Sequence, residues 1–85
     1  MEAQIEKIKQ SVKQKLSDTE YNLLLAKVDE KIKLNTSIDP AIVTMAELIS
    51  VLDKERIFDH LQNYEIPLTT IEKIFAYYDQ NETTN

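Results

Sequence analysis

The side chains best able to do acid–base or metal chemistry lie around His60, the only histidine of the sequence. Asp59 directly precedes it, Arg56 lies four residues earlier, and Glu55 and Asp59 form a carboxylate pair at i,i+4 spacing. Nucleophilic catalysis would need a serine or threonine brought beside the histidine, and a zinc site would need three further ligands. No spacing in the sequence favours either arrangement. We therefore interpret these residues as a solvated helix surface and expect no catalytic site, metal or cofactor.

Glycine is absent from the 85 residues, which excludes several kinds of site. Glycine supplies the positive-φ positions of tight turns and lets the backbone approach a ligand closely. Phosphate-binding loops, dinucleotide fingerprints and EF-hands need glycine at fixed offsets, and two-residue hairpin turns lose their preferred residue. The composition thus favours helices over sheet. It predicts a protein that is not an enzyme and that acts by binding another protein.

Charge is distributed unevenly along the chain. Residues 1–34 carry seven lysines against six acids, a net charge of +1, whereas residues 35–85 carry nine acids against three bases, a net charge of −6. The lysines alternate with acids and glutamines, which is typical of a solvated face and not of a nucleic-acid-binding stripe. No run reaches the roughly 18 apolar residues of a membrane span, and the N-terminus lacks the apolar stretch of a signal peptide. We expect a cytoplasmic protein that binds neither nucleic acid nor membrane.

Residues 2–16 predict a helix with one narrow apolar stripe, made of Ile5, Ile8, Val12 and Leu16. A helix with so little apolar surface is marginal in water and must dock on something. It is therefore either part of the core or an arm that docks on a partner. We favour the arm, which implies that the remaining helices fold without it.

Ser17 and Glu20 form a capping box that predicts the start of a second helix, and Asn35 is suited to end it in the left-handed conformation. This helix has two apolar faces, which predicts a place in the middle of the bundle, with a partner-binding site as the alternative. One face comprises Tyr21, Leu24, Leu25, Val28 and Ile32, and the other comprises Leu23, Ala26 and Leu34.

Asp39 and Pro40 are the N-cap and first residue of a further helix. Apolar residues of the segment 41–52 form a stripe along this helix. If the helix continued, the apolar residues at 57, 58 and 61 would lie more than about 100° around its axis from the centre of that stripe. Residues 40–63 are thus one helix with a rotated face or two helices, and we favour a break near residues 53–55.

A loop is predicted at residues 64–67, because the residue before Pro67 is restricted to extended geometry. Thr69 and Glu72 form a second capping box and predict the start of the last helix. Its inward residues are expected to be Ile71, Ile74, Phe75 and Tyr78. The sequence predicts an all-α fold: a small antiparallel bundle of three to five helices, one domain at residues 1–80 and a frayed polar tail at 81–85.

The order of these features resembles the epsilon antitoxins of the zeta–epsilon toxin–antitoxin systems. The resemblance covers roughly residues 12–78. It rests on Leu16-Ser17 and Tyr21-Asn22 where the second helix opens, Leu34-Asn35 where it closes, the apolar segment 48–52, and Leu68 with the segment 71–78. It implies a small helical bundle that neutralises a cytosolic zeta-type P-loop kinase within a heterotetramer, in a plasmid-maintenance system.

The resemblance also implies where the partner binds. The first helix of such an antitoxin occupies the nucleotide site of the kinase, so the outward stripe of residues 2–16 would be the partner-binding surface, with Glu2 and Glu6 as phosphate mimics. That stripe comprises Glu2, Glu6, Lys7, Gln10, Ser11 and Gln14. The family carries acids in the last turns of this helix, whereas Ser11 and Lys15 stand at the matching positions here.

Three other protein-binding functions fit the same residues. One is a bacteriocin immunity protein, and another is a phage- or plasmid-encoded inhibitor of a host enzyme that uses the acidic C-terminal half as a decoy. The third is an assembly subunit whose homodimer buries the patch around Leu23 and Leu34.

Overall fold

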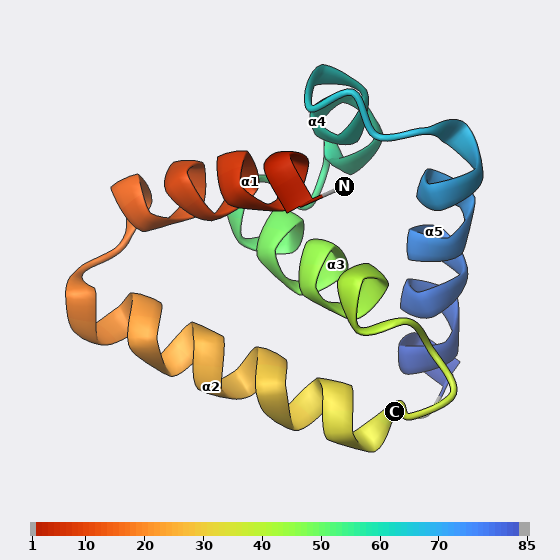
Figure 1. Cartoon of the computed structure of the whole chain (residues 1–85), viewed down its shortest axis with the longest axis horizontal. Coiled ribbons are helices and arrows are strands. Elements are labelled where there is room, and N and C mark those ends of the chain that lie inside the picture. Colours follow the sequence, from red (N-terminus) through yellow and green to blue (C-terminus); the bar gives the residue numbers. More distant parts are fainter. Residues whose placement is uncertain (1, 84–85) are drawn as a thin grey trace.

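The computed structural model describes residues 2–83, and it describes side chains as far as residue 80. In this range the chain forms five helices and no strand: α1 (Glu2–Lys15), α2 (Asp18–Leu34), α3 (Pro40–Leu52), α4 (Ile57–Asn63) and α5 (Leu68–Thr83) (Figure 1). The expected all-α bundle is confirmed. Residues 84–85 of the expected polar tail lie outside the described residues.

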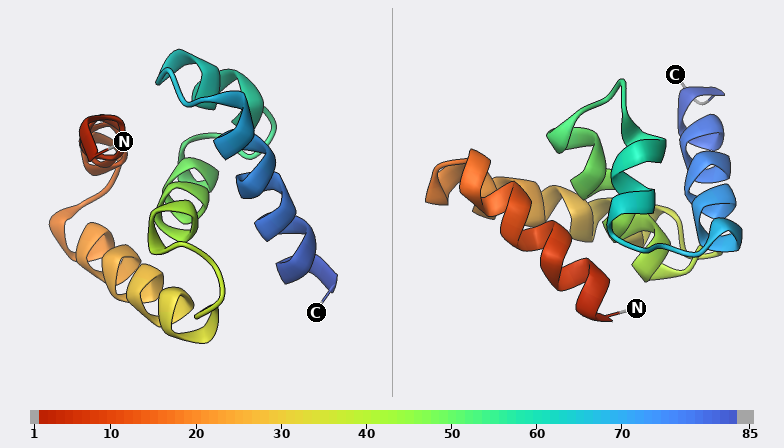
Figure 2. Two further views of the ribbon diagram at one scale, coloured as in Figure 1. Left: turned by 45° about the vertical axis from the view of Figure 1, so that its right-hand side comes forward. Right: turned by 90° about the horizontal axis from the view of Figure 1, so that it is seen from above.

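α3 is the centre of the bundle. α1 and α2 form a V-shaped antiparallel hairpin, α3 packs against both arms of the V, and α5 covers α3 on the side away from the hairpin (Figures 1 and 2). Seven of the 13 residues of α3 are buried, and Glu47 is its only charged residue. A helix that is apolar nearly all round is stable only when neighbours surround it, so composition accounts for the central place of α3.

The prediction that the second helix lies in the middle of the bundle is wrong. Val28 is the one buried residue of α2, and the second apolar face of this helix points to solvent, where Leu23 is 66% and Leu34 is 71% exposed. α2 packs mainly on α3 through its other face. Two apolar faces indicate a central helix only when each has a neighbour to bury it.

α1 belongs to the core, so the interpretation of a freestanding arm is also wrong. Ile8 and Val12 are completely buried, Ile5 and Leu16 pack on the core at either end, and α3 is the main neighbour of the stripe. Burying a side chain of this size stabilises the fold by about 1.5–3 kcal/mol. The two central residues alone make α1 an integral part of the bundle.

Two predicted helix starts and the predicted break are confirmed. The Ser17 hydroxyl accepts the Glu20 amide at 3.2 Å and the Glu20 carboxylate accepts the Ser17 amide at 3.0 Å, a complete capping box. The backbone hydrogen bond to Ser17 is the main reason that the pKa of Glu20 lies below its usual value. Asp39 caps α3 by accepting the Ala41 amide at 2.9 Å. α3 and α4 are separate helices.

Two other helix ends differ from the prediction. α5 begins at Leu68, so Thr69 lies inside its first turn, and the carbonyl of Pro67 accepts the amides of residues 70 and 71, both at 3.0 Å. Asn35 has φ −121°, outside the left-handed region. It closes α2 instead with its side-chain amide, which donates to the Lys31 carbonyl at 2.8 Å.

The left-handed position is occupied by Glu65, with φ 61°. Its amide donates to the Gln62 carbonyl at 2.9 Å, and the Ile66 amide donates to the Leu61 carbonyl at 3.1 Å. These two bonds, with Leu61 and Ile66 both buried in the core, make a Schellman motif at the end of α4. Glycine is the usual residue at this position because a Cβ is unfavourable there. A chain without glycine places a glutamate there instead.

Candidate protein-binding surfaces

Five of the six residues predicted to bind a partner share one exposed face of α1. We call this set the α1 outer face: Glu2, Glu6, Lys7, Gln10 and Gln14. It lies across the helix from the buried Ile8 and Val12. Because that stripe fixes α1 on α3, the face is presented by a helix that is already ordered.

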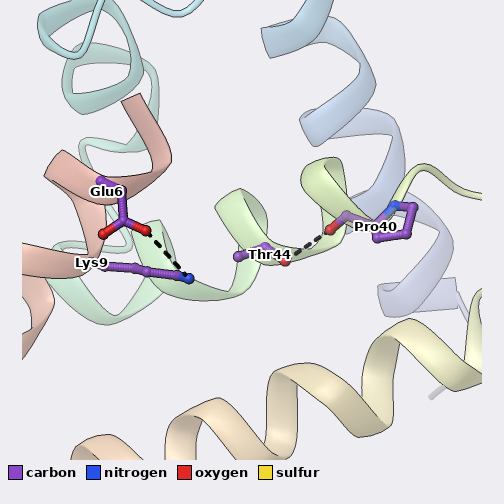
Figure 3. Close-up of polar contacts among 4 residues, drawn as sticks. All are labelled: Glu6, Lys9, Pro40 and Thr44. Atoms are coloured by element: carbon purple, nitrogen blue, oxygen red, sulfur yellow. Dashed lines mark hydrogen bonds and ion pairs between the residues drawn. The ribbon is translucent and has the colours of Figure 1, made fainter. Parts of the chain in front are cut away.

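Glu6 is the one member of the α1 outer face that pairs with a neighbouring cation in the described structure. The Lys9 side chain extends from α1 toward α3, and its ammonium lies 3.9 Å from the Glu6 carboxylate (Figure 3). The hydroxyl of Thr44 on α3 donates to the Pro40 carbonyl at 2.8 Å (Figure 3). A surface ion pair of this length contributes at most about 1 kcal/mol. Because this ion pair is weak, a cationic side chain of a partner can replace Lys9 as the neighbour of the Glu6 carboxylate.

Ser11, the sixth predicted residue, is half-buried and makes contacts within the chain. Its hydroxyl donates to the Lys7 carbonyl at 3.2 Å and accepts the hydroxyl of Tyr64 at 2.6 Å. Tyr64 follows the last turn of α4, so this pair ties α1 to the end of α4. The sequence separation of 53 residues explains why helical periodicity alone gave no sign of the contact.

Lys15 is used inside the fold as well. Its ammonium donates to the Leu52 carbonyl at 2.9 Å, at the C-terminal end of α3. The last carbonyls of a helix have no partner within the helix and carry partial negative charge, and α3 has no basic residue in its own last turn. Both residues that depart from the epsilon-antitoxin pattern, Ser11 and Lys15, thus have structural contacts that account for their type.

A second exposed surface lies on α4 and α5. We call Phe58, Leu68 and Phe75 the aromatic face; their exposed fractions are 41%, 59% and 37%. The rings of Phe58 and Phe75 are 6.5 Å apart, and the Phe75 ring meets the Tyr78 ring edge-on at 6.0 Å. Phe75 was predicted to face inward, and that is wrong. The buried aromatic residue is Tyr77, which sequence reasoning missed although it continues the 71, 74 spacing.

Tyr77 and Tyr78 attach α5 to α3. The Tyr77 hydroxyl donates to the Glu47 carboxylate at 3.0 Å, and the Tyr78 hydroxyl donates to the Ala46 carbonyl. Burial raises the pKa of both phenols, and the negative charge of Glu47 raises each further. Both hydroxyls act as hydrogen-bond donors that hold the two helices together.

A hollow of about 330 Å³ lies between the segment 37–42 and α5. Asp39, Lys73 and Tyr77 are among its lining residues. The carboxylate of Asp39 already accepts an amide of α3, and the hydroxyl of Tyr77 donates to Glu47. Two of its polar groups are thus already engaged in holding the fold.

The residues around His60 do not gather into a reactive cluster. Asp59 pairs with Arg56 at 3.5 Å, and the carboxylate of Asp53 accepts the amide of Glu55 at 2.9 Å. Among the residues that the structure describes, no group of three or more potential ligands could hold a metal ion. None of the helices in that range combines the length and apolar character needed to cross a bilayer.

Comparisons with models of protein families, with curated proteins and with solved structures gave no match.

Proposed function

We propose that the chain is a non-enzymatic protein-binding inhibitor, an antitoxin that neutralises a zeta-type P-loop kinase by blocking its nucleotide site with α1. The observation that carries the proposal is that α1 is fixed on the core by one side and exposed on the other: Ile8 and Val12 are completely buried, while the α1 outer face is exposed. An ordered helix loses little conformational entropy when it binds. The resemblance to the epsilon antitoxins, carried by residues between 12 and 78, implies the same role for this helix.

The acids of the α1 outer face have the spacing that such an inhibitor needs. Glu2 and Glu6 lie at i,i+4, so their Cβ atoms are about 5–6 Å apart on one side of the helix. A P-loop binds phosphates with backbone amides and a lysine. Two carboxylates on a rigid helix can accept hydrogen bonds from those same donors, and Gln10 and Gln14 extend the face with neutral amides.

A heterotetramer can be held together by a contact between the two copies of this chain, and the exposed side of α2 supports that part of the proposal. Leu23, Lys27, Glu30 and Leu34, all exposed, fall within about 60° around the helix axis and form what we call the α2 outer face. When two such helices pair antiparallel about a two-fold axis, each Leu23 meets a Leu34 and each Lys27 meets a Glu30. The face is thus self-complementary, as an isologous interface requires.

Co-expression with a zeta-type kinase tests the proposal. The wild-type chain is expected to restore growth, and the Glu2→Lys/Glu6→Lys variant to lose most of that rescue. The matched control is Asp29→Lys/Glu55→Lys, which makes the same charge change at exposed positions outside the α1 outer face. No rescue by the wild type rejects the kinase as partner. Equal rescue by both double variants rejects α1 as the binding site.

A further inference from the structure

We propose that the aromatic face of α4 and α5 is a docking site for a basic amphipathic helix of a partner protein. This surface shares no residue with the α1 outer face, and α1 and α5 lie on different sides of α3 (Figures 1 and 2). The proposal does not depend on the antitoxin function. The proposal rests on the fixed positions of the aromatic rings, on the arrangement of the apolar residues along α5 and on the negative charge of this part of the chain.

The aromatic rings are held in place before any partner binds. Phe75 has the Phe58 ring on one side at 6.5 Å and the Tyr78 ring edge-on at 6.0 Å. Tyr78 is fixed in turn by its hydrogen bond to the Ala46 carbonyl. Aromatic residues that are exposed and already ordered make strong binding anchors, because little side-chain entropy is lost on contact.

The apolar residues form a stripe of the length that a helix can cover. Leu68 and Phe75 lie two turns apart on nearly the same side of α5, with Glu72 between them, and Phe58 widens the stripe from α4. Leu68 and Phe75 span about 10 Å of the helix at 1.5 Å per residue, and Glu72 and Asp79 lie on the same side at i+4 and i+11, so apolar and acidic residues alternate along it. Such a stripe matches the i,i+3/i+4,i+7 anchors of an amphipathic helix.

The charge around the aromatic face selects a basic partner. Residues 55–80 carry five acids against two bases. Of those bases, Arg56 already lies 3.5 Å from Asp59, and Lys73 lines the hollow on another side of α5. The exposed Glu72, which lies between Leu68 and Phe75 on α5, attracts lysine-bearing segments, and the net charge of −3 over residues 55–80 acts in the same direction. This negative charge repels nucleic acids and anionic membranes, both of which are covered in negative charge.

The probe is a synthetic 14-residue peptide with leucines at helical i,i+3,i+4,i+7 spacing and lysines elsewhere, titrated into the ¹⁵N-labelled full chain. Amide shifts are expected to concentrate at residues 57–62 and 68–79, and a counterpart peptide with glutamate for lysine is expected to bind at least tenfold more weakly. Leu68→Ser is expected to weaken binding at least fivefold. Leu23→Ser, which changes an equally exposed leucine on α2, is expected to leave it unchanged.

Charge is tested by a second pair of variants. Glu72→Gln is expected to weaken the lysine peptide about threefold, while Glu30→Gln on α2 has no effect. The proposal is overturned if Leu68→Ser and Leu23→Ser behave alike, if both peptides bind equally, or if the shifts spread over α1 and α2. It is also overturned if the aromatic-face amides shift with protein concentration alone, because a second copy of the chain would then occupy the surface.

Discussion

The ammonium of Lys15 lies 2.9 Å from the carbonyl oxygen of Leu52, so the last residue of α1 caps the last residue of α3. α3 is the most buried helix and has no basic residue of its own in its last turn. The cap that a helix usually carries in its own sequence is here supplied by a residue 37 positions earlier. Lys15 thus supplies the positive charge that the last turn of α3 lacks.

Replacing Lys15 by methionine should lower the free energy of unfolding by about 1 kcal/mol, because a cation and a hydrogen bond are lost at the negative end of a helix. Methionine keeps much of the aliphatic side chain. Urea denaturation checks the value. Lys27→Met, at an exposed position on α2, should change stability by less than about 0.5 kcal/mol. Equal effects of the two variants would show that the cap is not responsible.

Glu65→Gly should stabilise the protein by about 1 kcal/mol, because glycine relieves the unfavourable left-handed conformation of the glutamate. Glu55→Gly is the matched control, since Glu55 is an exposed turn residue that is not in the left-handed region. It should be neutral or destabilising, as glycine there only adds freedom to the unfolded chain. The melting temperature should therefore rise in Glu65→Gly and stay the same or fall in Glu55→Gly.

Ile8→Ala should destabilise the protein by about 2–5 kcal/mol, the usual range for a buried aliphatic side chain cut to alanine. Ile5→Ala, on the same stripe but only partly buried, should cost clearly less. Removal of residues 2–15 should abolish the cooperative unfolding transition by circular dichroism, because α3 would lose its main neighbour. A truncated chain that still melts cooperatively would restore the idea of a freestanding arm.

Stability should fall as the pH rises above about 10, the ordinary pKa of tyrosine. The folded state holds the pKa of Tyr77 and Tyr78 above that value, mainly because they are buried. The unfolded chain therefore releases these protons first. Each tyrosine then costs the folded state up to about 1.4 kcal/mol per pH unit. Tyr77→Phe should lower stability at pH 7 by removing the bond to Glu47, and it should flatten the fall above pH 10. An unchanged slope would contradict the assignment.

Charge reversal across the α2 outer face tests self-pairing through Lys27 and Glu30. Lys27→Glu alone or Glu30→Lys alone places like charges opposite each other and should weaken any dimer measured by analytical ultracentrifugation. The double exchange should restore it, because the pairs become opposite again. The α2 outer face has four residues, fewer than the roughly 20–30 on each side of a standard interface, so the dimer is expected only at high protein concentration. Additive weakening in the double variant would reject this pairing.

Residues close in sequence determined the starts of α2 and α3 and the break between α3 and α4. Ser17 with Glu20, and Asp39 with Pro40, satisfy the first amides of their helices within three residues, so their effect does not depend on the rest of the fold. The break between α3 and α4 followed from the change of apolar face. The buried stripe of α1 was also read correctly as a stripe, and five of the six residues on its other side are exposed.

Tertiary structure decided which apolar faces are buried and which polar side chains form hydrogen bonds within the chain. Leu23 and Leu34 have the periodicity of a core face but no neighbour, whereas Ile8 and Val12 have α3 against them. Ser11 and Lys15 looked like surface residues until Tyr64 and the Leu52 carbonyl came within hydrogen-bonding distance. Periodicity and capping act over a few residues along one helix. Burial depends on which helix lies alongside, and that is set by packing between segments far apart in the chain.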